Sequence, residues 1–200
     1  MTHKGSCMKK LTHKDLMGLE EYARKRKEFR EKVIEHKKNR RVQIGDHAAL
    51  YFEDAFTMQY QVQEMLRIEK IFEPEGIQEE LDVYNPLIPD GNNWKATFMI
   101  EFNDVEERKK ALAKMIGVEK KIWVKVEGCD PVNPIANEDL DRETEDKTSA
   151  VHFMRFELTP DMVAKAKAGA KISMGIDHPA YQHSVELAEN IRTALVKDLA

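Results

Sequence analysis

The sequence predicts an α+β fold, a mostly antiparallel sheet of about six strands with helices packed mainly on one face and a charged N-terminal helix. Apolar and polar residues alternate in several short runs, which is typical of strands with one buried face. Helical patterns lie between these runs without the strict strand–helix–strand repeat of a parallel sheet. A chain of 200 residues is long enough to bury a sizeable core.

The charged helix is predicted to begin near residue 12 and to continue to about residue 40. Thr12 and Asp15 have the spacing of a capping box, with Asp in place of the usual Glu. Ten Lys or Arg against three Glu lie between residues 24 and 41. We interpret this excess as the solvated outer face of an amphipathic helix, with a basic surface for phosphate groups as the alternative.

The segment 56–102 is the unit on which we expect the other elements to pack. It is predicted to form a helix at 56–72, a short helix at 77–84, an irregular loop at 85–93 and a strand at 94–102. Prolines restrict the backbone of the loop. Because a stiff loop loses little entropy when it is ordered, such loops often carry binding groups.

The remaining elements follow from the same signals. Further strands are predicted at 41–46, 48–54, 122–126, 151–158 and 171–177, and further helices at 104–116, 160–168 and 179–199. Residues 1–10 are expected to form a flexible extension, and residues 11–200 a single α+β domain.

Three titratable residues are predicted to project from otherwise apolar faces: Glu69 on a helix, His152 on a strand and His178 just past a strand end. Tyr181 lies close to His178 in the sequence. A buried carboxylate or imidazole must be paired, hydrogen-bonded or neutral. These residues therefore form a candidate pocket for a metal ion or an acid–base pair, with internally satisfied structural groups as the alternative.

A candidate binding surface is predicted on the face of the 56–72 helix opposite the apolar stripe and on the loop that follows. Gln59, Gln63 and Arg67 form a polar row along one face of the 56–72 helix, for which a plain solvated face is the alternative. The irregular loop adds the polar residues Asn85, Asp90, Asn92 and Asn93.

No motif in the sequence specifies catalysis or a cofactor. It contains no HExxH, CxxCH or glycine-rich phosphate loop, so no catalytic residue and no cofactor is predicted. If the chain binds a metal ion, Glu69, His152 and His178 are the expected ligands. The sequence leaves open whether the protein is an enzyme, and a non-enzymatic role is favoured.

Composition limits the partners and the cellular compartment that we expect for the protein. The net charge of −4 gives no general attraction to nucleic acid. No run approaches the ~20 apolar residues of a membrane span, and the N-terminus has no apolar signal region. Two cysteines without a CxxC pair fit a reducing compartment. We therefore expect a cytoplasmic protein with no membrane association, whose oligomeric state the sequence does not specify.

Four segments carry a family resemblance: LTHKDLMGLEEYARKR, HKKNRRVQIGDHAALYFEDAFTMQYQVQEMLRIEKIFEPEGIQEELDVYNPLIPDGNNWKATFMIEF, EDLDRETEDKTSAVHFMRFELT and GIDHPAY. Over residues 9–185 the chain resembles an uncharacterised bacterial domain-of-unknown-function family. Its members tend to be encoded beside rubrerythrin and an iron–sulfur oxidoreductase similar to heterodisulfide-reductase or glycerol-3-phosphate-dehydrogenase subunits. The resemblance implies a role near peroxide defence or electron transfer, and it implies no functional residue.

Three functions remain open on this basis. The leading hypothesis is a non-catalytic accessory or interaction protein that serves a redox system, with rubrerythrin or an iron–sulfur oxidoreductase as partner. The second is an enzyme or metal-binding protein that uses the Glu/His pocket. The third is nucleic-acid binding through the basic N-terminal helix.

Overall fold

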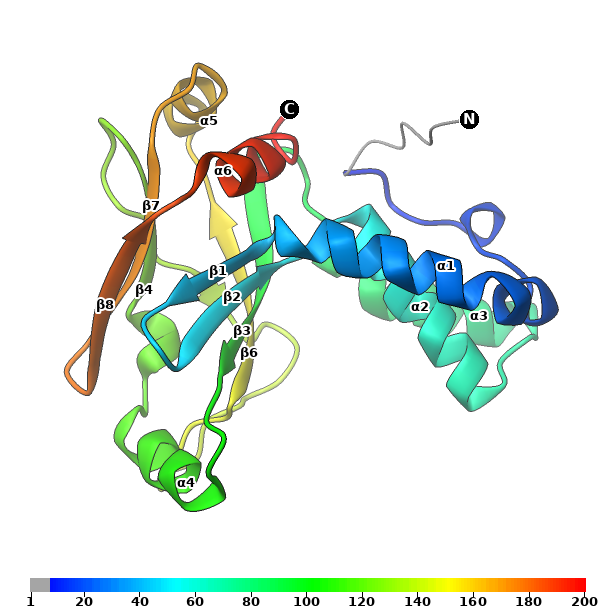
Figure 1. The fold of residues 1–200 in the computed structure, drawn as a ribbon, viewed down its shortest axis with the longest axis horizontal. Coiled ribbons are helices and arrows are strands. Elements are labelled where there is room, and N and C mark those ends of the chain that lie inside the picture. Colours follow the sequence, from blue (N-terminus) through cyan, green and yellow to red (C-terminus); the bar gives the residue numbers. More distant parts are fainter. Residues whose placement is uncertain (1–7) are drawn as a thin grey trace.

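A computed structural model describes residues 8–200 of the chain. Within this range it has six α-helices, three short 3₁₀ helices and eight strands in two antiparallel sheets (Figure 1). The α+β prediction is therefore confirmed, with two sheets in place of one. Residues 1–7 lie outside the described range, and with them Cys7 and most of the expected extension.

The N-terminal half forms a helical unit that lies beside the sheets (Figure 1). Its elements are η1 (His13–Asp15), α1 (Leu19–Lys38), α2 (Ala55–Glu69), α3 (Pro74–Tyr84) and η2 (Asn85–Leu87). Asp54 begins α2, because its carboxylate accepts hydrogen bonds from the backbone N–H groups of Phe56 and Thr57. The helices enclose a small core of their own, made of Leu11, Met58, Val62, Leu66, Leu81 and Ile88.

The larger sheet has the strand order β1-β2-β3-β6-β5. Its strands are β1 (Arg41–Ile44), β2 (Ala48–Phe52), β3 (Asn93–Ile100), β5 (Ile135–Ala136) and β6 (Val151–Glu157). Strand β3 pairs with β2 on one side and with β6 on the other, so that Phe98 lies between Leu50 and His152. All three of these side chains are fully buried, as the alternation in β6 predicts.

The smaller sheet has the order β4-β7-β8. Its strands are β4 (Ile122–Val126), β7 (Ile172–His178) and β8 (Tyr181–Glu186). The prediction of a helix from residue 179 is wrong, since His178 pairs directly with Tyr181 across a tight hairpin turn. Pro179 lies in that turn and does not open a helix. The last helix, α6 (Glu189–Val196), begins ten residues later than predicted.

The two sheets share one core. An isolated bridge between Val124 and Val132 joins β4 to the segment before β5. On the other side, the hydroxyl of Tyr181 in β8 donates a 2.7 Å hydrogen bond to the carbonyl of Ile44 in β1. Strands from both sheets therefore enclose the same interior, which contains Phe52, Trp94, Phe98, Phe156, Ile122, Val124, Ile172, Met174 and Ile176 among others.

The remaining helices lie at the ends of the sheets. Figure 1 shows α4 (Val105–Lys114) at one end, and α5 (Pro160–Lys167) and α6 at the other. The indole N–H of Trp94 donates a 2.9 Å hydrogen bond to the carbonyl of Leu195, which fixes α6 over the core. The short helix η3 (Val118–Lys120) precedes β4. The expectation that helices cover one face of the sheet is not confirmed by this arrangement.

No helix in residues 8–200 combines the length and the apolar character that a membrane span requires.

Candidate functional site

The structure brings together only part of the candidate pocket. His178 and Tyr181 face each other in the β7–β8 hairpin. Glu69 lies in the last turn of α2, in the helical unit, and its side chain is exposed to solvent. The expectation that Glu69 is buried is therefore wrong. Lys70 caps the end of α2 in a left-handed conformation with φ 56°, and residues 67–69 of the last turn are exposed.

Hydrogen bonds within the fold engage both His178 and Tyr181. The backbone N–H of Ala180 donates to Nδ1 of His178 over 3.1 Å, so Nε2 carries the proton and donates to the carbonyl of Ile116 over 2.9 Å. The Tyr181 hydroxyl accepts a hydrogen bond from the backbone N–H of His47, in addition to its bond to β1. Burial raises the pKa of Tyr181, so the phenol stays protonated.

A cavity of about 360 Å³ lies beside Tyr181. It lies between α4, the turn that joins β1 to β2, and the turn that joins β7 to β8. The imidazole of His47 stacks on Phe102 with a centroid distance of 3.9 Å, and Met115 adds a buried apolar wall. Lys110 and Lys114 belong to the cavity's charged rim. An apolar interior with charges at the mouth suits a small amphipathic molecule.

His152 belongs to a separate buried cluster. Its Nδ1 lies 2.9 Å from the side-chain amide of Asn137, and its Nε2 lies 3.0 Å from both the carbonyl of Ser149 and the hydroxyl of Thr148. Burial lowers the pKa of His152, which favours the neutral imidazole. Glu119, which is 5% exposed, lies nearby. Its negative charge raises the pKa of His152 and so opposes the effect of burial.

The buried groups do not form a recognisable metal site. Among residues 8–200, no three His, Cys, Asp or Glu side chains are grouped so that they could hold a metal ion. Cys129 is a free thiol that lies 3.4 Å from Asp161.

The polar row on α2 binds another segment of the same chain. Gln63 is fully buried, and its amide oxygen accepts from the backbone N–H of Met17 while its amide nitrogen donates to the Met17 carbonyl. Gln59 donates to the carbonyl of Asp15 over 2.5 Å. Arg67 lies 3.4 Å from Glu64 and remains on the surface. Two of the three residues thus hold the N-terminal segment.

The loop after α3 completes this attachment. The side-chain oxygen of Asn85 accepts a 2.7 Å hydrogen bond from the backbone N–H of Leu11. Its side-chain nitrogen donates a 3.0 Å hydrogen bond to the Leu11 carbonyl. Each of two side-chain amides, Gln63 and Asn85, therefore binds both backbone groups of one residue. The result is a clamp on the segment that precedes α1, and Leu11 is buried in the helical core.

The rest of the loop is organised by charge. Asp90 forms ion pairs with Lys10 at 2.9 Å and with the nearly buried Lys95 at 2.8 Å. Burial opposes ionisation of Asp90, but hydrogen bonds from Asn93, Lys95 and Lys10 hold its pKa below the ordinary value. Asn93 is buried and bonds to Asp90, whereas the side chain of Asn92 is exposed.

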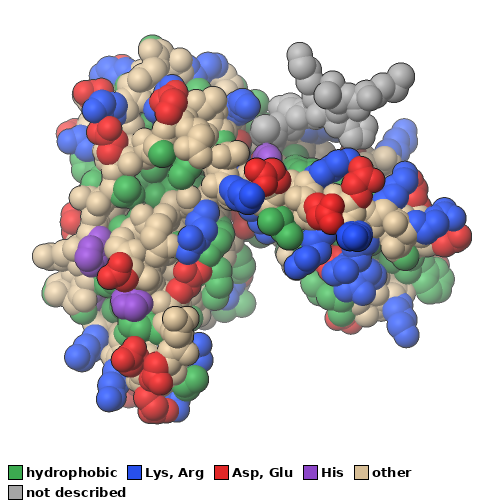
Figure 2. All heavy atoms as spheres, in the orientation of Figure 1, with side chains coloured by type: hydrophobic (Ala, Val, Ile, Leu, Met, Phe, Trp, Pro, Cys, Tyr) green, Lys and Arg blue, Asp and Glu red, His purple; other side chains and the backbone are tan. Residues whose placement is uncertain are grey.

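The basic face of α1 is largely paired with acids. Four of its cations form ion pairs with Glu side chains three or four positions away: Arg24 with Glu20, Lys25 with Glu21, Lys32 with Glu28 and Lys38 with Glu35. Figure 2 shows basic and acidic side chains intermixed on the helical unit. Such pairing reduces the positive potential that a phosphate backbone would meet.

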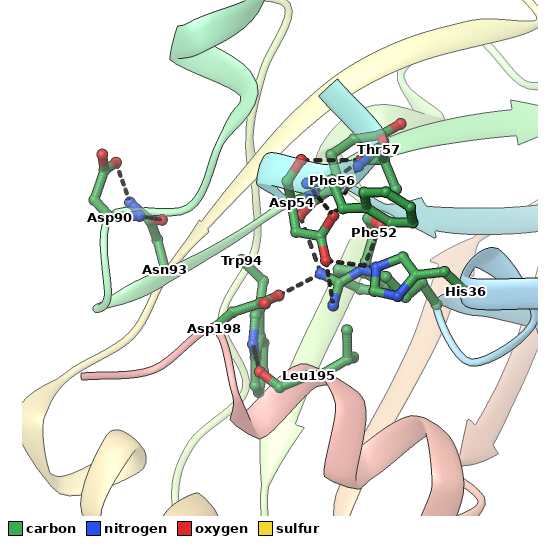
Figure 3. Close-up of polar contacts among 12 residues, drawn as sticks. His36, Phe52, Asp54, Phe56, Thr57, Asp90, Asn93, Trp94, Leu195 and Asp198 are labelled. Carbon is green, nitrogen blue, oxygen red and sulfur yellow. Dashed lines mark hydrogen bonds and ion pairs between the residues drawn. The ribbon is translucent and has the colours of Figure 1, made fainter. Parts of the chain in front are cut away.

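A buried ionic cluster, absent from the sequence predictions, lies where the helical unit meets the sheets. Arg40 contacts Asp54 at 3.4 Å and Asp198 at 2.5 Å, and all three side chains are at most 2% exposed. His36 adds a 2.6 Å contact to Asp54. Figure 3 shows His36, Asp54 and Asp198 converging from α1, the start of α2 and the C-terminal segment.

The acidic members of this cluster differ in their titration. Burial opposes ionisation of Asp54, yet the hydrogen bond from His36 and the charge of Arg40 keep its pKa below the ordinary value. Burial raises the pKa of Asp198 to about 6 despite the neighbouring Arg40. Oδ1 of Asp198 has no hydrogen-bond partner among the described residues, which is consistent with a strongly desolvated carboxyl.

Comparison with known proteins identifies a family and a similar solved structure. A family model described as "Protein of unknown function (DUF3501)" matches residues 10–199. The chain is also similar to a protein of unknown function from Burkholderia pseudomallei K96243, whose crystal structure is known. That protein is 49% identical, the match covers 96% of this chain and 100% of the other, and the TM-score is 0.90. No curated protein matches.

Proposed function

The chain belongs to the DUF3501 family, and we propose that it is a non-catalytic accessory protein that binds another protein through the hairpin of α2 and α3. The observation that carries the proposal is the exposure of large apolar side chains on this hairpin. Phe72 is 69% exposed, Val83 62% and Ile68 56%. Ile68 and Phe72 lie on either side of Lys70, where α2 ends. A partner that covered these side chains would remove apolar surface from water.

The internal engagement of the titratable groups supports a non-catalytic role. A general base needs a free lone pair within reach of a substrate proton. His152 and His178 use both ring nitrogens in contacts within the fold, and Tyr181 uses its hydroxyl to join β8 to β1. Glu69 lies far along the chain from these groups, in the helical unit.

The proposed partner is the one that the family resemblance implies. Genes for rubrerythrin and an iron–sulfur oxidoreductase tend to lie beside those of similar proteins. We therefore name these two proteins as the partners, in a cytoplasmic redox or peroxide-defence system. In this arrangement the partner holds the iron, and the DUF3501 protein contributes a binding surface.

Co-purification tests the proposal. The full chain is co-expressed with affinity-tagged rubrerythrin or the iron–sulfur oxidoreductase from the same genome, and each tagged protein is isolated. We expect co-purification with one of them, and its loss in the Ile68→Ser/Phe72→Ser variant. Val105→Ser is the matched control, because Val105 is an exposed apolar residue of α4, 49% accessible and outside the hairpin.

Two results would contradict the proposal. One is the absence of either partner from the purified material. The other is unchanged co-purification of the Ile68→Ser/Phe72→Ser variant, which would place the contact elsewhere. Urea unfolding of each variant shows whether the fold is retained, so a lost contact is distinguished from a lost structure.

A further inference from the structure

The outer face of the smaller sheet carries a groove of about 460 Å³, far from the hairpin proposed to bind a protein. Strand β4 forms one side of the groove, and the segment 131–133 forms the other. Its lining includes one indole, three amines, one amide and one carboxylate: Trp123, Lys120, Lys121, Lys125, Asn133 and Asp177. The geometry points to a binding site for a mononucleotide, a planar base that carries phosphate.

Trp123 provides a surface for the base. Its ring lies over Gly175 of β7, where an added Cβ would be 2.3 Å from Cζ2 and 2.9 Å from Nε1. Only glycine leaves this space, so the indole ring packs directly against the backbone of β7 at Gly175. A flat indole that lines a groove offers one face for stacking, and base–aromatic stacking contributes ~1–3 kcal/mol per base.

The indole nitrogen of Trp123 lies on the sheet side of the ring, 2.9 Å from the position of an added Cβ on Gly175. Nε1 is buried, and it has no hydrogen-bond partner within residues 8–200. An unsatisfied buried donor costs ~1–3 kcal/mol, so the ring is held in this position by its packing against the sheet and its other face is left for the ligand. The other tryptophan, Trp94, has its buried N–H satisfied, because the N–H donates a hydrogen bond to the Leu195 carbonyl.

The lysines provide the charge that a phosphate requires. Lys121 and Lys125 are exposed, and neither has an ion pair with any described residue. Lys120 has only a long contact of 3.6 Å to Glu119. Three amines on one groove, in a protein whose net charge is −4, form a local positive site that favours an anion.

The other polar groups suit the base and the sugar. Asn133 uses its amide nitrogen to donate to the carbonyl of Ile122 over 2.7 Å, and its Oδ1 accepts no hydrogen bond from the described residues. Asp177 is exposed and presents a carboxylate to the groove. The Asn133 Oδ1 and the Asp177 carboxylate are hydrogen-bond acceptors. They match the donor amino groups of a base and the donor hydroxyls of a ribose. The volume lies within the range of small-molecule sites, which favours a mononucleotide over a longer strand.

Tryptophan fluorescence tests this site directly in the full chain. The chain has two tryptophans, and Trp94 is fully buried with its N–H bonded, so a change on ligand addition reports Trp123. We expect AMP to quench the emission saturably, and Trp123→Phe to abolish the quenching. In Lys121→Gln/Lys125→Gln we expect AMP to bind at least about tenfold more weakly. The matched control is Lys27→Gln/Lys167→Gln, which removes two exposed lysines elsewhere and should leave the affinity unchanged.

Three further ligands separate the contributions of the phosphate, the base and a longer nucleic-acid strand to binding. Adenosine lacks the phosphate and inorganic phosphate lacks the base, so each should bind more weakly than AMP. An oligothymidylate of eight nucleotides distinguishes a free nucleotide from a nucleic acid. Tighter binding of the oligothymidylate than of AMP would overturn the assignment to a mononucleotide. The absence of quenching at millimolar AMP, or equal AMP affinity in Lys121→Gln/Lys125→Gln, would overturn the site itself.

Discussion

Nη2 of Arg40 donates a 2.5 Å hydrogen bond to Oδ2 of Asp198, although 158 positions separate the two residues in the chain. The same guanidinium donates to the carbonyls of Phe52 and Glu53. Arg40 therefore joins the end of α1, the end of β2 and the C-terminal segment. Arg40 thus provides a buried polar contact at the boundary between the helical unit and the sheets.

Removal of the guanidinium should destabilise the protein strongly. Arg40→Ala leaves Asp54 and Asp198 buried without their cation, and loss of one partner of a buried pair costs about 3–5 kcal/mol. Urea unfolding at pH 7 measures the change. The neighbouring Arg41→Ala is the control, because Arg41 is 42% exposed and its pair with Glu101 should contribute less than about 1 kcal/mol. Equal effects of the two substitutions would refute the assigned role of Arg40.

Asp198 should make stability depend on pH in the direction opposite to most acids. Its pKa is about 6 in the folded protein and close to 3.8 when unfolded, so the folded state holds the proton more tightly. Stability from this group is complete below about pH 4 and is lost as pH rises through 6. We expect the free energy of unfolding, relative to Asp198→Asn, to fall by roughly 2–3 kcal/mol between pH 4 and pH 7. A constant difference across this range would show that Asp198 titrates normally.

Glu64 should show the usual acidic behaviour. The hydrogen bonds from Arg26, 2.7 and 2.9 Å long, lower its pKa to about 2 against an opposing effect of burial. Stability from this group is present above about pH 4.5 and is lost as pH falls to 2.

The corresponding variant is Glu64→Gln. At pH 7 it should lose roughly 2–3 kcal/mol, and the difference from the unsubstituted chain should disappear near pH 2. Glu31→Gln is the matched control, since Glu31 is an exposed residue of α1 without a hydrogen-bonded partner in the described range. Acid titration of α-helical circular dichroism checks both variants, and a pH-independent effect of Glu64→Gln would refute the ion-pair explanation.

The clamp on the N-terminal segment predicts a local effect. Asn85→Ala removes both hydrogen bonds to Leu11, each with a net value of about 1 kcal/mol, so the segment should open more often. Limited trypsin digestion after Lys9, Lys10 or Lys14 should become faster while cleavage in the sheets does not. Asn92→Ala is the control, because this loop residue is exposed and its side chain makes no hydrogen bond within residues 8–200. Equal cleavage rates in the two variants would argue against the clamp.

Local signals in the sequence predicted much of the fold. Alternation over a few residues identified β3, β6 and β7, and capping side chains placed the starts of α4 and α5. Strand β8 was missed because Pro179 resembles the first residue of a helix. One face of β8 carries Tyr181, His183 and Val185, which pair with His178, Ile176 and Met174 of β7 and follow a period of two that the helical interpretation ignored.

The site could be predicted less well, because its contacts are long-range. The sequence pattern placed Glu69 on an otherwise apolar helix face, but the pattern does not show that the last turn of α2 is exposed. Gln59 and Gln63 looked like a free surface, and only the fold shows that residues 15 and 17 cover them. Asp54 could have been recognised as the residue that caps α2. Nothing local in the sequence links Arg40 to Asp198.

If the α2–α3 hairpin binds the partner as proposed, hydrogen–deuterium exchange of the complex should detect the contact there. Exchange is compared for the chain alone and for the chain with the co-expressed iron protein. We expect new protection to concentrate in peptides that span residues 66–84, with little change in β4, β7 and β8. Protection confined to the sheets, with unchanged exchange in residues 66–84, would contradict the claim.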